Sequence, residues 1–186
     1  PTERNIKDNI VFEDFKTFSS DIFSFSVPWT DIEEAKEDET RTTISFESGN
    51  SINFFCFENN TTIMDAYDKD YAKIITEIFD LNNPNDNHEF TQKIYSVSPD
   101  DYNFFISKKE LAKLAFALPM KASTLLAKSY IYHFNHNNIR GFQYDINNGV
   151  LLEIDNTNYI CSIPIKGESV SQDEIDYIIS MIKIKE

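Results

Sequence analysis

Alternation of apolar and polar residues predicts strands in the first third of the chain. Phe23–Val27 alternates strictly and stops at a proline, which is typical of a half-buried strand. Thr42–Glu47 and Ser51–Glu58 are also strand-like, and the Ser-Gly-Asn connection between them predicts a β-hairpin. The acidic segment Asp31–Thr40 has few apolar residues, so we expect a loop or one exposed helical turn there.

Apolar positions three and four residues apart predict helices in the middle of the chain. Thr62 offers an N-cap for a helix that ends near Leu81, where an Asn-Asn-Pro sequence follows. Phe90–Val97 alternates imperfectly, and we interpret it as a strand. Ser107 begins a capping box for a further helix, which Pro119 is expected to stop or kink.

The last third of the chain combines strands with a terminal helix. A capping box at Ser171 opens that helix, whose isoleucines form one narrow apolar stripe. The predicted strands are Ser129–Phe134, Gly141–Ile146, Val150–Asp155 and Asn158–Ile165. We therefore predict an α+β fold, with an antiparallel sheet of about six or seven strands flanked by helices.

The order of these elements resembles that of PsbP-like domains. Phe23-Ser24-Phe25-Ser26-Val27-Pro28 resembles their F-x-F-x-x-P opening, and Gly141–Ile165 followed by Ser171–Ile184 resembles their closing meander and final helix. The resemblance covers about two thirds of the chain. It implies an antiparallel sheet between helices, as in the photosystem II extrinsic subunit, Ran-binding nuclear import factors and bacterial envelope lipoproteins. It also implies a helical insertion at about 88–128 and a non-enzymatic binding, adaptor or immunity-type role.

The ends of the chain bear on location and domain organisation. We expect residues 1–20 to be an N-terminal tether or first element, and residues 21–186 to be a single domain. The chain begins at Pro1, which fits a signal peptide or lipoprotein leader removed upstream, with a lipid anchor lost there; an ordinary trimmed start is the alternative. No apolar run reaches the roughly 20 residues of a membrane span. The expected location is extracytoplasmic.

Charge indicates what kind of partner the chain would bind. Its 17 basic and 31 acidic residues give a net charge of −14, which argues against nucleic acid and favours a basic protein partner. Asp31–Glu39 holds six acidic residues in nine, and such a run is either a solvated loop or a docking surface. An exposed Trp29 would join that surface, whereas a buried one would only anchor the first strand. The candidate partner-binding residues are Trp29, Asp31, Glu33, Glu34, Glu37 and Asp38.

Few residues suggest a metal site. A polar loop carries four oxygen donors, which permits a loose calcium site although the spacing is not that of an EF-hand: Asp80, Asn82, Asp86 and Glu89. His133 and His136 are three positions apart, which on a strand places them on opposite faces, so we expect no shared metal ion. We predict no cofactor.

The remaining chemistry favours a binding protein over an enzyme. Cys56 and Cys161 lie in strand-like segments and could form a disulfide, but we expect two buried thiols. No phosphate-binding loop or nucleophile motif occurs, so no enzyme is predicted. The predicted function is a non-enzymatic extracytoplasmic binding or adaptor protein of a bacterial cell envelope. The alternatives are an immunity protein or chaperone that neutralises a basic effector, and a protein that binds a small ligand or calcium.

Overall fold

The structure is a computed structural model that describes residues 2–98, 100, 106–124, 131–144, 149–154 and 157–185. The chain forms two compact units. We call residues 2–58 with 132–186 the sheet unit, and residues 59–131 the helical unit. The fold class is α+β, as the sequence predicts. The helical unit begins well before the segment 88–128 that the resemblance sets apart.

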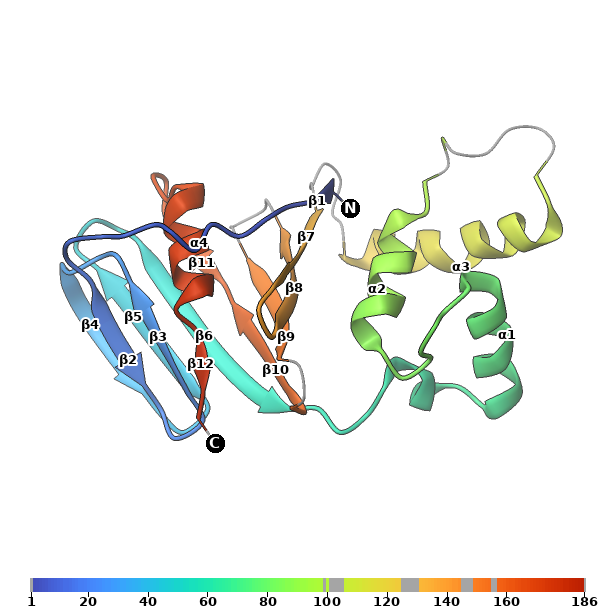
Figure 1. The fold of residues 1–186 in the computed structure, drawn as a ribbon, viewed down its shortest axis with the longest axis horizontal. Coiled ribbons are helices and arrows are strands. Elements are labelled where there is room, and N and C mark those ends of the chain that lie inside the picture. Colours follow the sequence, from blue (N-terminus) through green and yellow to red (C-terminus); the bar gives the residue numbers. More distant parts are fainter. Residues whose placement is uncertain are drawn as a thin grey trace. The chain divides into compact units, whose positions relative to one another are not determined.

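The sheet unit is built on a mixed sheet of nine strands (Figure 1). Their order is β1-β7-β8-β9-β10-β6-β5-β4, and β11 also pairs with β6. The strands are β1 (Thr2–Glu3), β4 (Ile32–Glu37), β5 (Arg41–Phe46), β6 (Ser51–Glu58), β7 (Ile131–His136), β8 (Ile139–Tyr144), β9 (Val150–Ile154), β10 (Tyr159–Ile163) and β11 (Ile165–Lys166). β1 runs parallel to β7, whereas β4–β5–β6 and β8–β9–β10–β6 are antiparallel.

The sheet is larger than the six or seven strands predicted. Two of its strands, β1 and β11, are only two residues long and leave no periodic pattern to recognise. A third, β4, occupies the acidic segment in which we expected a loop or helical turn. Expected strand residues 129–130, 145–146 and 155, and the N-terminal Pro1, lie outside the described residues.

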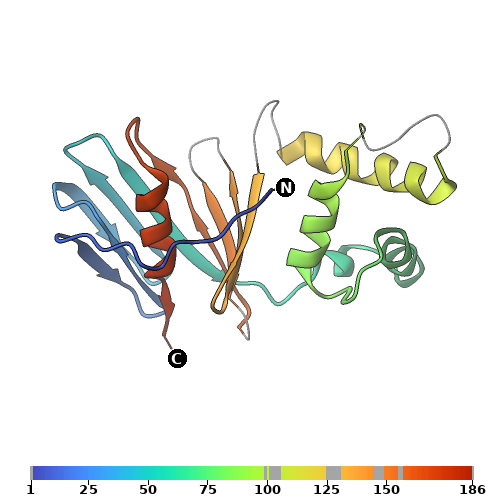
Figure 2. The same ribbon diagram turned by 45° about the horizontal axis from the view of Figure 1, so that its top comes forward.

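A second, three-stranded sheet and a helix cover one face of the large sheet (Figure 2). The small sheet has the order β12 (Lys183–Ile184), β3 (Phe23–Val27), β2 (Lys16–Ser19), and α4 (Gln172–Ser180) contacts β3. Phe23 and Phe25 are fully buried and pack on Phe54 of β6, with ring centroids 4.4 and 4.5 Å apart. The core of the sheet unit therefore lies between the two sheets, where α4 adds its buried isoleucines.

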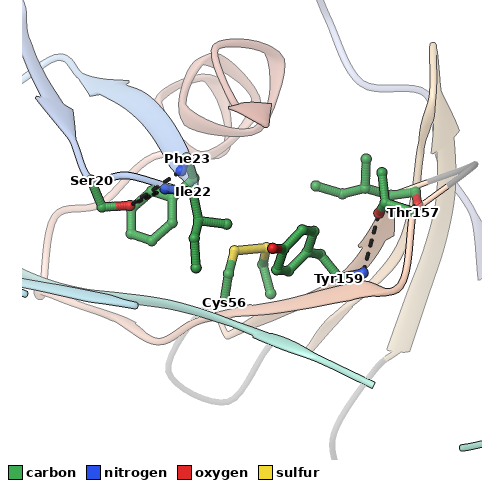
Figure 3. Close-up of a disulfide and its surroundings, with 8 residues drawn as sticks. Ser20, Ile22, Phe23, Cys56, Thr157 and Tyr159 are labelled. Atoms are coloured by element: carbon green, nitrogen blue, oxygen red, sulfur yellow. Dashed lines mark hydrogen bonds between the residues drawn. A yellow bond between two sulfur atoms is a disulfide. The ribbon is translucent and has the colours of Figure 1, made fainter. Parts of the chain in front are cut away.

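A disulfide between Cys56 and Cys161 joins the neighbouring strands β6 and β10 of the large sheet (Figure 3). The two residues face each other directly across β6 and β10, with their Cα atoms 4.1 Å apart. Our expectation of two buried thiols is therefore wrong, although both residues are buried. Sequence periodicity could not reveal the bond, because the pairing of β6 with β10 joins segments 105 residues apart.

The helical unit contains a 3₁₀ turn and three helices among its described residues. They are η1 (Ile63–Ala66), α1 (Lys69–Phe79), α2 (Asn87–Ser96) and α3 (Lys108–Thr124). The Thr62 capping box opens the 3₁₀ turn, whereas Asp68 caps α1 by accepting a hydrogen bond from the amide of Tyr71. α3 continues through Pro119 to Thr124, so the proline does not stop it. No described helix combines the length and apolar character required to cross a membrane.

The predicted strand at Phe90–Val97 is wrong, because this segment belongs to α2. Asp86 begins the helix by accepting a hydrogen bond from the Glu89 amide at 2.9 Å. Phe90 and Ile94, four residues apart, are both buried, and that spacing places them on one helical face. The ring of Phe90 meets that of Phe79 edge to face, at 5.9 Å between centroids.

Candidate functional site

The candidate site is the outer strand of the large sheet, which we call the β4 edge (Ile32–Glu37). In the described part of the chain, β4 pairs with β5 alone. Its first residue is half-buried and the other five are exposed. Three of these five are glutamates, namely Glu33, Glu34 and Glu37. The acidic run of the sequence is thus displayed on a strand at the end of a sheet (Figure 1).

Two aspartates hold the ends of the β4 edge in place. Asp31 accepts a hydrogen bond from the Ser48 amide at 2.7 Å, and its own carbonyl accepts one from the Glu47 amide. The hydrogen bond from the Ser48 backbone lowers the pKa of the Asp31 carboxyl. Asp38 closes the turn into β5, where its carboxylate accepts a hydrogen bond from the Thr40 amide at 3.0 Å. These carboxylates order the strand, whereas the three glutamates are displayed to solvent.

The only positive side chain on β4 is Lys36, among residues that the structure fully describes. Its ammonium lies 2.9 Å from the carboxylate of Glu34, and both side chains are largely exposed. An exposed pair of this kind contributes little to stability and is screened by salt. The strand therefore keeps a net negative charge, with three glutamates against one lysine.

Trp29 does not lie on this surface. Its side chain is 7% exposed, and its indole N–H donates a hydrogen bond to the Glu174 carboxylate of the α4 capping box at 2.6 Å. Its ring also packs edge to face against Phe46 of β5, with centroids 5.2 Å apart. Trp29 therefore anchors the chain after β3, which is the role that the sequence analysis assigns to a buried tryptophan.

The four candidate calcium ligands lie in the helical unit, where their side chains support the fold. Glu89 accepts hydrogen bonds from the amides of Asn82 and Asn83, both at 2.9 Å, and Asp86 caps α2. Asp80 forms ion pairs with Lys109 and Lys113. Chiefly because of its hydrogen bond with Lys109, the pKa of Asp80 lies below its usual value.

No group of three or more metal-binding side chains gathers among the described residues. His133 and His136 both lie on β7, three positions apart, and are half-buried. Partial burial lowers the pKa of His133, because desolvation disfavours the imidazolium form. His136 interacts with the side-chain amide of Asn137 at 2.9 Å. The histidines thus belong to the strand and its turn.

We expect Glu89→Gln to lower the free energy of unfolding by about 1 kcal/mol at neutral pH. The reason is that a neutral amide replaces a carboxylate that accepts several N–H hydrogen bonds in the loop before α2. Burial raises the pKa of Glu89, but the hydrogen bonds from Asn82 and Asn83 outweigh it, so the net shift is downward. The stabilisation is therefore fully present above the ordinary pKa of 4.5 and is lost as the pH falls through the lower folded-state value.

Thermal unfolding of wild type and Glu89→Gln at pH 7 and at pH 3 checks this expectation. The difference in midpoint should be clear at pH 7 and should shrink at pH 3. A difference that is the same at both pH values would show that the charge of Glu89 contributes nothing.

The helical unit also has an open depression that sequence reasoning did not locate. Its volume is about 530 Å³, and Met64, Tyr67, Lys73 and Pro84 contribute to its lining. These residues come from η1, the connection between η1 and α1, α1 itself and the loop after α1, and no sequence motif connects them.

Comparisons with known proteins assign no family. No protein-family model matches the chain, and no curated protein matches it. A crystal structure from Bacteroides thetaiotaomicron VPI-5482 is similar over 92% of this chain, with 15% sequence identity and a TM-score of 0.35. The chain spans about half the length of that protein (48%). A similarity at this level supports no argument on fold or function.

Proposed function

We propose that this chain is a non-enzymatic extracytoplasmic binding or adaptor protein of a bacterial cell envelope. The observation that carries the location is the Cys56–Cys161 disulfide. Disulfides persist in oxidising compartments such as the periplasm and the cell surface, and they are rare in the reducing cytosol. Both cysteines are buried in the core of the sheet, which fits a structural bond and not a catalytic one.

We also propose the finer fold assignment, a PsbP-like sandwich. Three features support it: the Phe23–Val27 strand, the antiparallel β4–β5–β6 and β8–β9–β10 segments, and a final helix packed on the core. Fold alone does not define a function. The binding role therefore depends on the surface of this chain.

The surface that supports a protein partner is the β4 edge. It combines exposure, an ordered backbone and a net negative charge, which together favour a basic protein. An immunity protein or chaperone that neutralises a basic effector is the second candidate, and the net charge of −14 favours it. Both candidates predict a specific complex whose affinity falls as salt is added.

Capture of partners by the tagged, exported chain tests the proposal. We expect one protein from the envelope or secreted fraction of its source to be retained at low salt, in a fixed ratio to the bait, and released at moderate salt. Mass spectrometry of the eluates identifies it, and a bait with Glu33, Glu34 and Glu37 changed to glutamine is the control. Failure to retain any protein in a fixed ratio, even after chemical cross-linking, would contradict the binding role.

A further inference from the structure

We propose that the β4 edge binds an extended, basic segment of a partner protein as an added β-strand. This inference rests on the proposed binding function and names how the partner is recognised. Strand addition uses two components, which are main-chain hydrogen bonds to an open sheet edge and side-chain selection along the added strand. The β4 edge provides both.

The backbone of β4 has one side that faces away from the sheet. The Asp38 amide donates to the Arg41 carbonyl at 2.8 Å, and the register then places Lys36 opposite Thr43. In an antiparallel ladder, only alternate residues direct their N–H and C=O groups toward the neighbouring strand. Lys36 therefore bonds toward β5, whereas the N–H and C=O groups of Ala35 and Glu37 face outward.

A β-bulge limits where a new strand can pair. The register of β4 with β5 shifts between Ile32 and Glu34 and is then regular from Glu34 to Glu37. Bulges twist an edge and interrupt pairing, so the regular part is the section that can accept another strand. The added strand would therefore pair along Glu34–Glu37, next to the outward groups of Ala35 and Glu37.

Charge selects the occupant of this edge. Side chains of an added strand would lie beside those of Glu34 and Glu37, and opposite charges at such cross-strand positions are stabilising. A second copy of this chain would place a strand with three glutamates and one lysine beside an identical strand, so two net negative charges would meet there. The edge therefore favours a strand with lysine or arginine on both of its faces over its own copy, because Glu34 and Glu37 are three positions apart and lie on opposite faces of β4.

A fluorescein-labelled peptide of repeating Lys-Lys-Thr, which presents lysines on both faces when extended, provides the probe, and its binding to the full chain is followed by anisotropy at low and moderate salt. The decisive variant is Ala35→Pro. Proline removes the outward N–H of residue 35, which is not part of the β4–β5 ladder, and proline is tolerated on an edge strand in that orientation. We expect Ala35→Pro to weaken peptide binding at least tenfold. The matched control Ala35→Val keeps the N–H, and its affinity should stay within twofold of wild type.

A second probe leaves the protein unaltered and tests the same hydrogen bonds if Ala35→Pro changes the far-UV circular dichroism. The peptide carrying an N-methyl group at every residue keeps its charge but cannot donate main-chain hydrogen bonds along either edge, so it should also bind at least tenfold more weakly. Equal binding of the methylated peptide would overturn strand addition. So would unchanged binding by a folded Ala35→Pro variant, or no peptide binding at low salt.

The two proposals fail in different ways. A captured protein that binds Ala35→Pro as tightly as wild type would refute strand addition while leaving the binding function in place. Failure to capture any protein would instead refute the proposed function itself.

Discussion

Replacing Cys56 and Cys161 together with alanine is expected to lower the free energy of unfolding by about 2–5 kcal/mol. The disulfide joins residues 105 positions apart, so its loss releases a long loop in the unfolded chain. In the chain-entropy description, closing a loop of about 100 residues is equivalent to nearly 5 kcal/mol. The two strands would keep their ladder hydrogen bonds, because the register of β6 with β10 does not depend on the sulfur atoms.

Denaturant unfolding of wild type and of the double variant measures this effect. Wild type in the presence of a reductant is the control, since it breaks the bond and keeps both side chains in the core. Equal midpoints for oxidised and reduced wild type would show that the bond does not stabilise the fold. Two titratable thiols in native, oxidised protein would show that it does not form.

We expect Asp176→Asn to destabilise the sheet unit by about 3 kcal/mol, because it removes one partner of a buried ion pair. Asp176 is 2% exposed and pairs with Arg4. It also accepts hydrogen bonds from the Lys7 amide at 3.1 Å and from the Gln172 side chain at 3.0 Å. Burial lowers the pKa of Arg4, although the guanidinium stays charged at neutral pH. The variant would leave that charge without its carboxylate.

The neighbouring aspartate of α4 provides a matched control. Asp173 pairs with Lys7 at 2.7 Å, but both side chains are more than half exposed. Asp173→Asn should therefore change the free energy of unfolding by less than about 1 kcal/mol. Denaturant unfolding compares the two variants, and equal losses would contradict a special role for the buried pair.

Elements with a strong local signal could be predicted from the sequence. The β3 strand matches the Phe23–Val27 prediction because its three apolar residues are all buried, although Ser26 is buried as well. The capping box at Ser171 begins α4 as expected. β4 was not predicted, because an edge strand with exposed side chains needs no apolar alternation. The segment of α2 favours a strand in the sequence because Ile94 and Ser96 alternate with Tyr95 and Val97, and this local alternation hides the helical spacing of Phe90 and Ile94.

The candidate site could be predicted only in part. Composition identified the acidic residues of the β4 edge, but their display on the last strand of a sheet follows from pairing with β5. The burial of Trp29 depends on Glu174, 145 residues away, and the disulfide depends on a strand pair separated by 105 residues. Such contacts are set by the tertiary structure, and a single sequence carries no local trace of them.

The position of the disulfide also determines how the chain tolerates cleavage. The chain leaves the sheet unit after β6 and returns to it at β7, and the bond joins β6 to β10 across this excursion. A protease that cuts once within residues 59–131 would produce two fragments that migrate as one species until a reductant is added. The helical unit is thus held as a covalently closed loop, so a nick in it would leave the strand pair of the sheet unit joined.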